Sequence, residues 1–191
     1  MSPDDVPLHQ DEPPRAAEGA AGSDEVIRQF VEHWGVMARS WGINATMGEL
    51  FALLYITGTD WTAEALRERL RISRGNVSMN LRELMAWGVV HKVHRRGERR
   101  EFYRAEADVW TLFRRILAER KRRELEPTLA VLDHTAARIV HDPALAPIQG
   151  RVLALQRFFA LIDALTTRLA ALDPADLEDL LGLLDPSSPR R

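Results

Sequence analysis

AEALRERLRISRGNVSMNLRELMAWGVVHKVHRRGERREFYRA, residues 63–105, is the stretch of sequence that decides the fold. A short helix is predicted over Ala63–Leu70, with Thr62 as its N-cap. A longer helix is predicted after a three-residue turn that ends at Ser73, its N-cap. Two β-prone runs, GVVHKV and REFYRA, flank HRRGER, whose glycine is typical of a hairpin loop. A helix-turn-helix followed directly by a β-hairpin is the winged-helix arrangement.

The longer helix is predicted to have one apolar face and one face suited to DNA. At 100° per residue, Val77, Leu81 and Leu84 share a narrow stripe that should face the core. Arginine, asparagine and serine hydrogen-bond base edges, and a methionine contacts a thymine methyl group. The residues predicted to bind DNA from this helix are Ser73, Arg74, Gly75, Asn76, Ser78, Met79, Asn80 and Arg82.

Two of these residues are unusual on a solvent-facing surface. Gly75 would let the helix backbone approach a phosphate, whose charge also suits a helix N-terminus. The alternative is that Gly75 is a tolerated first-turn glycine and Met79 an ordinary exposed apolar residue. The hairpin favours the DNA interpretation, because guanidinium groups on a loop bind phosphates or enter a minor groove. The loop arginines predicted to do so are Arg95, Arg96, Arg99 and Arg100.

Composition restricts the remaining possibilities. The 191 residues include no cysteine and no apolar run that could span a membrane, and the N-terminus lacks the pattern of a secretory signal. We therefore expect a cytoplasmic protein. The net charge is only −2, but residues 61–123 carry 17 Lys and Arg against 8 Asp and Glu. This basic middle predicts a local anionic partner, and a solvated charged face is the alternative.

The segment from Glu49 to Trp110 resembles the GbsR-like branch of the MarR superfamily of bacterial transcriptional regulators. The likeness extends over about residues 25–140, and its most specific part is SRGNVSMNLREL followed by WGVVHKVHRRGERREFY. This resemblance implies a dimeric, cytoplasmic, DNA-binding winged-helix protein. It also implies that Ser73–Arg82 is the reading helix and Arg95–Arg100 the wing.

The predicted architecture is mainly α with a small β-hairpin, in four segments. Residues 1–22 contain four prolines and five acidic residues, so we expect a disordered N-terminal extension. Residues 23–106 are predicted to form the winged helix-turn-helix, and residues 107–184 a helical dimerisation region. Residues 185–191 should be a disordered tail.

The predicted dimerisation helix has two apolar stripes. One stripe follows alternating spacings of 4 and 3, and it contains Ile148, Val152, Leu155, Phe159, Ile162, Thr166 and Leu169. The second contains Phe158, Leu161, Leu165 and Leu172. A helix that is apolar on two sides needs partners on both, which predicts a homodimer. A helical core within one chain is the alternative.

The aromatic residues suggest an effector pocket. Trp34 and Trp41 lie seven residues apart on the first predicted helix, and Trp110 with Phe113 begins the helix after the wing. An aromatic box of these four side chains could hold a cationic small molecule by cation–π attraction, and core packing is the alternative.

The sequence as a whole predicts a sequence-specific regulator of transcription that binds double-stranded DNA. No catalytic motif, metal site or cofactor site is predicted, and we expect no enzyme activity and no membrane partner. The alternative is a winged helix that serves as a protein-interaction module without DNA binding. That alternative predicts a recognition face without basic side chains, and Arg74 and Arg82 argue against it.

Overall fold

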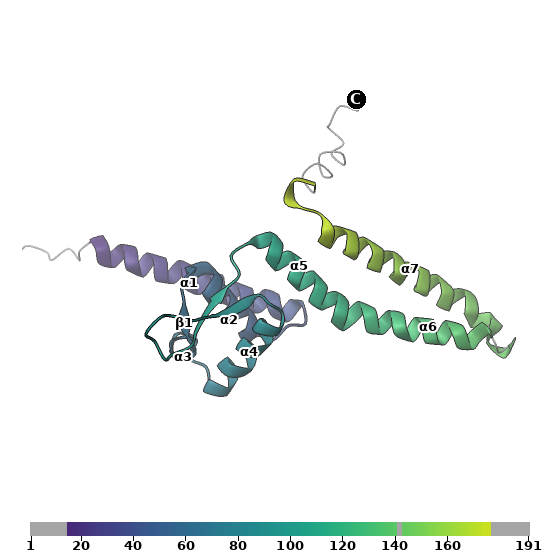
Figure 1. The fold of residues 1–191 in the computed structure, drawn as a ribbon, viewed down its shortest axis with the longest axis horizontal. Coiled ribbons are helices and arrows are strands. Elements are labelled where there is room, and N and C mark those ends of the chain that lie inside the picture. Colours follow the sequence, from purple (N-terminus) through teal and green to yellow (C-terminus); the bar gives the residue numbers. More distant parts are fainter. Residues whose placement is uncertain (1–14, 141–142, 177–191) are drawn as a thin grey trace, which may run out of the picture. The chain divides into compact units, whose positions relative to one another are not determined.

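The computed structural model describes residues 15–140 and 143–176. It is mostly helical and has one small antiparallel sheet, so the predicted fold class is confirmed (Figure 1). The elements in chain order are α1 (Arg15–Ser40), α2 (Ala45–Thr57), β1 (Trp61–Thr62), α3 (Ala63–Leu70), α4 (Arg74–Ala86), β2 (Val90–Val93), β3 (Phe102–Ala105), α5 (Val109–Arg120), the π-helical turn η1 (Lys121–Leu125), α6 (Glu126–Val140), the 3-10 turn η2 (Pro143–Leu145) and α7 (Ala146–Ala171).

The chain divides into two compact units. Met1–Arg82 and Lys92–Arg104 form the first unit, and Glu83–His91 and Ala105–Arg191 form the second. This division differs from the expected boundary after residue 106, because the end of α4 and the base of the hairpin make their contacts with α5 and η1.

The helix-turn-helix forms as its sequence predicts. The Thr62 hydroxyl caps α3 by accepting from the N–H of Ala65 at 3.2 Å. The Ser73 hydroxyl caps α4 by accepting from the N–H of Asn76, also at 3.2 Å. In the turn between the helices, Arg71 takes the left-handed conformation with φ of 54°.

The start of helix α1 differs from the prediction. Helix α1 begins at Arg15, whereas residues 15–22 were expected to be disordered. The alanine-rich run that follows Pro14 has high helix propensity and no further proline, so the helix extends toward the N-terminus. Residues 1–14, the rest of that extension, lie outside the described residues, as does the predicted tail. Helix α2 is capped by Asn44, whose Oδ1 accepts from the N–H of Thr46 at 2.9 Å.

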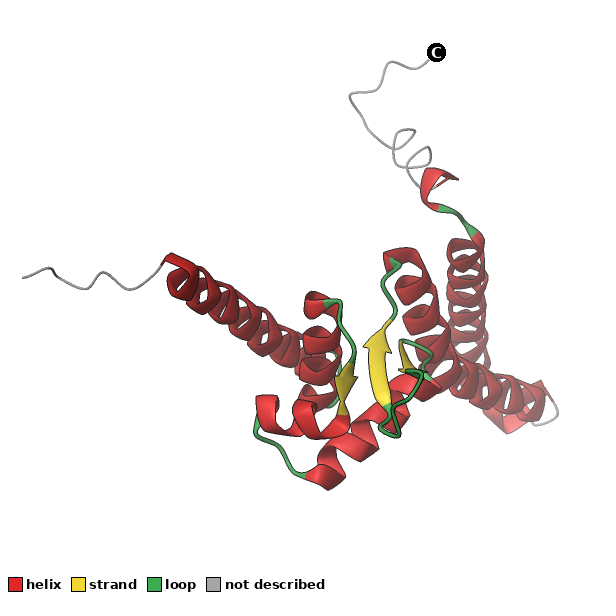
Figure 2. Ribbon diagram, turned by 60° about the vertical axis from the view of Figure 1, so that its left-hand side comes forward, coloured by secondary structure: helices red, strands yellow, loops and turns green. Residues whose placement is uncertain are grey.

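The sheet contains one strand more than the hairpin. Its order is β1-β3-β2, with Trp61 paired to Tyr103 and Thr62 paired to Phe102 (Figure 2). Two residues are too few for the alternating pattern that identifies a strand in a sequence, so β1 was not predicted. The strand ties the start of the helix-turn-helix to the wing.

In the first unit α1 packs on α2, and α4 also buries apolar side chains. Leu50, Leu53 and Leu54 of α2 are at most 1% exposed. The predicted inward residues Val77 and Leu81 are 1% and 2% exposed, which confirms the predicted rotation of α4.

The second unit contains the C-terminal helices. Helix α7 returns alongside α6 (Figure 1). Between α5 and α6, the π-helical turn shifts the hydrogen bonding, because the N–H of Glu126 donates to the carbonyl of Lys121, five residues back. This shift occurs one residue before Pro127, which has no N–H to donate. In the part of the chain that the structure describes, no helix is long and apolar enough to cross a membrane.

We expect Gly48→Ala to destabilise the first unit by about 1–3 kcal/mol. An added Cβ would lie 2.6 Å from the Cβ of Ala38 and 2.9 Å from the carbonyl oxygen of Trp34, so α1 and α2 would have to separate. Gly75→Ala is the matched control, since its Cβ would meet no atom within 4 Å. Urea denaturation of both variants measures the difference. Equal stability of the two variants would show that α1 and α2 are not in close contact at Gly48.

Candidate nucleic-acid interface

The outward face of α4 is open to solvent. Five of the residues predicted there are exposed along with their N-cap, namely Ser73, Arg74, Gly75, Ser78, Met79 and Arg82. The side chain of Met79 is 51% exposed. No atom lies within 4 Å of the position that a Cβ on Gly75 would take. Packing among the described residues therefore explains neither why residue 79 is a methionine nor why residue 75 is a glycine.

Asn80 is a correction to the predicted DNA-contacting set. Its residue exposure is 2%, so its side chain cannot reach a base edge. Its Nδ2 instead donates to the backbone carbonyl of Asn76 at 2.8 Å and to the Oδ1 of Asn76 at 3.1 Å. Asn76 itself is half-buried at the edge of the outward face. Asn80 thus holds Asn76 from the buried side of α4.

The four loop arginines of the wing divide into paired and unpaired groups. Within residues 15–140 and 143–176, Arg96 and Arg99 have no hydrogen-bond or ion-pair partner. Arg100 pairs with Glu98 through two hydrogen bonds of 3.0 Å. Arg95 forms an ion pair with Asp60, which belongs to the same unit. Of these four arginines, only Arg96 and Arg99 lack an acidic partner among the described residues.

Asp60 is the residue that holds Arg95. Its side chain is 4% exposed, and its Oδ2 accepts from the Nε and Nη2 of Arg95 at 3.0 and 2.9 Å. Its Oδ1 accepts from the Nε of Arg104 on β3 at 2.6 Å. The guanidinium of Arg95 also lies 4.3 Å from the ring centre of Phe102. One carboxylate therefore fixes the wing at its loop, through Arg95, and at β3, through Arg104.

These hydrogen bonds shift the ionisation of Asp60. The bond from Arg104 and then that from Arg95 hold the pKa of the Asp60 carboxyl below its usual range, although burial opposes the shift. Sequence reasoning missed Asp60 and Arg104. Their signal in the sequence is weak, because 44 residues separate them and only the pairing of β1 with β3 brings them together.

Glu101 neutralises a further cation of the hairpin. Its Oε1 accepts from the Nζ of Lys92 on β2 at 2.7 Å, and its Oε2 accepts from the hydroxyl of Tyr103 at 2.9 Å. Burial, followed by this hydrogen bond, raises the pKa of Tyr103 to about 12. Lys92 therefore adds little net positive charge to the strands of the wing. The arginines of the wing without an acidic partner among the described residues, Arg96 and Arg99, lie in its loop.

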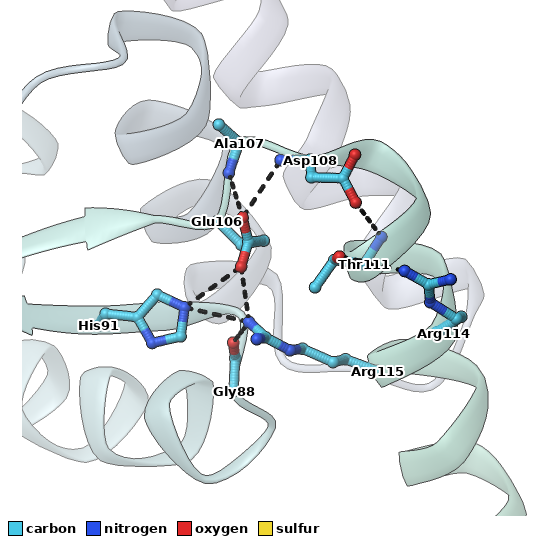
Figure 3. Close-up of polar contacts among 8 residues, drawn as sticks. All are labelled: Gly88, His91, Glu106, Ala107, Asp108, Thr111, Arg114 and Arg115. Carbon is cyan, nitrogen blue, oxygen red and sulfur yellow. Dashed lines mark hydrogen bonds and ion pairs between the residues drawn. The ribbon is translucent and has the colours of Figure 1, made fainter. Parts of the chain in front are cut away.

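In the second unit, Glu106 fixes the chain between the hairpin and α5 (Figure 3). Its Oε1 accepts from the N–H groups of Ala107 and Asp108 at 3.0 and 3.3 Å. Its Oε2 accepts from Nη1 of Arg115 at 2.9 Å. The backbone N–H of Asp108 is the main reason that the pKa of Glu106 lies below its usual range.

Arg115 joins that carboxylate to the end of α4 (Figure 3). Its Nη1 donates to the carbonyl of Gly88, and it lies 3.0 Å from Nε2 of His91 on β2. A second contact lies about one turn before Gly88 on α4, where Glu83 forms an ion pair of 2.8 Å with Arg123 of η1. The last turn of α4 is thus held by residues of α5 and η1.

The structure does not bring the four residues of the predicted effector pocket together within one unit. Trp34 and Trp41 belong to the first unit, and Trp110 and Phe113 to the second. Trp34 stacks on Phe30 with ring centres 4.5 Å apart, and Trp41 is 53% exposed. Trp110 and Phe113 make an edge-to-face pair with ring centres 5.8 Å apart. The aromatic box stays a prediction.

A separate cavity of about 360 Å³ lies within the second unit. It is lined by Leu117, Arg120, Lys121, Glu124, Leu125, Thr128, Phe159, Ile162 and Thr166. None of the four predicted aromatic residues lines it. Both of its cations are paired: Lys121 lies 2.8 Å from Asp163 and from Thr167, and Arg120 lies 3.0 Å from Glu124. Among the described residues, no group of three or more His, Asp or Glu side chains is placed to hold a metal ion.

We expect Asp60 to contribute to stability at neutral pH and to lose that contribution in acid. Because the pKa of Asp60 is depressed in the fold, its stabilisation is present above the pKa of an unfolded aspartate and disappears as pH falls through the folded pKa. Asp60→Asn should lower the free energy of unfolding at pH 7 and weaken its decline below about pH 5. Urea denaturation across that range measures both effects.

Glu68→Gln serves as the control for Asp60→Asn, since the Glu68 side chain is 67% exposed. An Asp60→Asn variant with the stability and acid sensitivity of the wild type would mean that the carboxylate does not hold the wing.

Comparison with known proteins agrees with the winged helix. A sequence model of the MarR family matches residues 41–101, from the residue after α1 to the residue before β3. The HTH-type transcriptional repressor GbsR of Bacillus subtilis (strain 168) is 26% identical over 127 residues, which cover 66% of this chain and 68% of GbsR. YvaV, described as an HTH-type transcriptional regulator of the same organism, is 25% identical over 84 residues, which cover 44% of this chain and 48% of YvaV.

A solved structure shares the fold. The crystal structure of a transcriptional regulator superposes with a TM-score of 0.59 at 20% sequence identity, over 76% of this chain and 95% of that one. The relatives found are regulators of transcription and not enzymes. The segment that contains the helix-turn-helix is thus similar in sequence to the MarR family and to these two relatives, and the solved structure shares the fold.

Proposed function

We propose that this protein binds double-stranded DNA with sequence specificity, and that α4 enters the major groove while the wing contacts the backbone or the minor groove. The observation that carries the proposal is the outward face of α4, where Gly75 and Met79 lie open to solvent without a packing role. Helix-turn-helix proteins present such a face to base edges.

The two parts of this surface are suited to different roles. Arg96 and Arg99 lie on an exposed loop without acidic partners, so they are free to neutralise phosphates. Asn76, Ser78 and Arg82 carry the hydrogen-bonding groups that distinguish bases. We infer that the wing supplies affinity and α4 supplies specificity.

The competing function is a protein-interaction module. It predicts a recognition face without basic side chains, whereas Arg74 and Arg82 are exposed on α4 and two wing arginines are unpaired. An acidic protein partner would also fit these cations. The exposed Met79 beside a glycine that permits close backbone approach favours a groove with thymine methyl groups and phosphates.

We expect Arg96→Ala and Arg99→Ala each to weaken DNA binding to all sequences alike. Each variant removes one phosphate contact, so the slope of log affinity against log salt should flatten by about one unit. Fluorescence anisotropy with duplexes of the protein's own upstream DNA, between low and moderate salt, measures the slope.

Arg100→Ala is the matched control, because Glu98 already compensates that arginine and its loss should change the slope less. Equal slopes for the wild type and for both Arg96→Ala and Arg99→Ala would contradict the role of the wing.

The proposal includes a homodimer, because one winged helix reads only a short site. Helix α7 buries none of its 26 residues, all of which the structure describes. Its half-buried stripe contains Phe159, Ile162 and Thr166, which line the cavity next to η1. A second stripe remains open, and Phe158, Leu161 and Leu165 in it are 56%, 56% and 53% exposed. A second copy of the chain would cover these side chains.

We expect the wild-type protein to elute as a species of about twice the 21.7 kDa chain mass. Leu161→Glu with Leu165→Glu should produce the single-chain mass, because it places charge on the open apolar stripe. Gel filtration with light scattering at micromolar concentration measures the mass, and circular dichroism verifies helix content. Ala171→Glu, at an exposed position at the end of α7, is the control. A wild-type protein of single-chain mass would exclude the dimer.

A further inference from the structure

Asn80 is a buried polar residue on a helix face that otherwise buries apolar side chains. It is 2% exposed, as is Leu81 next to it, and Val77 is 1% exposed. A buried amide is stable only when its polar atoms are hydrogen-bonded. The Nδ2 of Asn80 makes two hydrogen bonds, both to Asn76, one turn earlier on α4. This pair lies directly beneath the proposed reading face.

The chemistry of the contacts fixes the orientation of both amides. The backbone carbonyl of Asn76 can only accept, so the atom of Asn80 that lies 2.8 Å from it must be the NH₂ group. The same NH₂ group lies 3.1 Å from the side-chain amide of Asn76 and has a second hydrogen to donate. The Asn76 atom that receives it must therefore be the oxygen Oδ1. Exchange of O and N in either amide would place two donors or two acceptors in contact.

Asn76 is consequently held in one state. Its Oδ1 faces a side chain that is 2% exposed, and its NH₂ group branches from Cγ in the opposite direction, away from Asn80. Its backbone N–H is also held, because it donates to the Ser73 hydroxyl at 3.2 Å. Arg82, by contrast, has one hydrogen bond, from its Nε to the carbonyl of Ser78 at 3.2 Å, and is exposed.

We propose that Asn80 determines specificity by making Asn76 a donor toward DNA and not an acceptor. This inference rests on the proposed function, in which α4 lies in the major groove. An asparagine that is free to turn contacts adenine with both amide atoms, donating to N7 and accepting from N6. With Oδ1 turned to Asn80, Asn76 cannot accept from adenine N6 or cytosine N4. It can donate to guanine O6 and N7, and to a single acceptor of thymine (O4) or adenine (N7). Guanine alone offers two acceptors and cytosine offers none, so Asn76 selects guanine at the base that it reaches and disfavours cytosine most.

The test is a selection of bound sites from duplexes with a random central segment, using the full chain. Asn76→Ala identifies the base position read by Asn76, because preference should flatten there and persist elsewhere. At that position the wild type should favour guanine over adenine and cytosine by at least about fivefold.

Two variants then separate the roles of the residues. Asn76→Asp replaces the outward NH₂ group by an oxygen, so it should reverse the preference toward cytosine or adenine, whose amino groups donate. Asn80→Leu keeps the buried volume but removes the donor, so Asn76 regains rotation and adenine should gain at least about fivefold at that position. Arg82→Ala is the control variant and should change a different base position.

The possible failures are distinguishable. A wild type that selects no sequence would overturn the proposed function and the inference together. A wild type that selects a site but prefers adenine at the position of Asn76 would overturn the inference alone. The inference would also fail if Asn80→Leu, or Asn76→Asp in case Asn80→Leu does not fold, left the preference at that position unchanged.

Discussion

Burial of one apolar stripe fixes the rotation of α4 about its axis, and the proposed DNA surface depends on it. Val77, Leu81 and Leu84 are 1%, 2% and 2% exposed. Burying each such side chain contributes about 1.5–3 kcal/mol, and a rotation by one residue would turn the stripe by 100°. The core therefore holds Met79 and Arg82 toward solvent. No interaction on the outward face is needed to keep them there.

Acidic partners determine how the basic residues of the wing are used. Asp60 holds Arg95 and Arg104 in ion pairs, and these two arginines fix the position of the wing. Arg96 and Arg99 have no such partner within the described ranges, so their charge remains available to an anion. The basic stretch of the chain thus contains two kinds of arginine: those paired with a carboxylate, which hold the fold, and those without one, which can bind an anion. The neighbours of each arginine decide to which kind it belongs.

The end of α4 is held by the C-terminal half of the chain. Arg115 contacts the carbonyl of Gly88 and the carboxylate of Glu106, and Arg123 pairs with Glu83. These contacts lie within the second unit, although the first turns of α4 belong to the first. A displacement of α5 or η1 must therefore break these contacts or move the last turn of α4. Within the second unit, the last turn of α4 is therefore fixed to α5 and η1.

The sequence by itself determined the helix-turn-helix, the hairpin, the caps Thr62 and Ser73 and the exposure of Met79, because these follow from local hydrogen bonding and helical period. Only the tertiary structure decided the pairing of Asp60 with Arg95, since 35 residues separate them and strand β1 is too short to recognise. Only the tertiary structure decided the burial of Asn80 as well. At 100° per residue it lies 60° from Val77, at the edge between the two faces, where the pattern favours neither burial nor exposure. Packing against the core and a hydrogen bond to the neighbouring turn placed it inside.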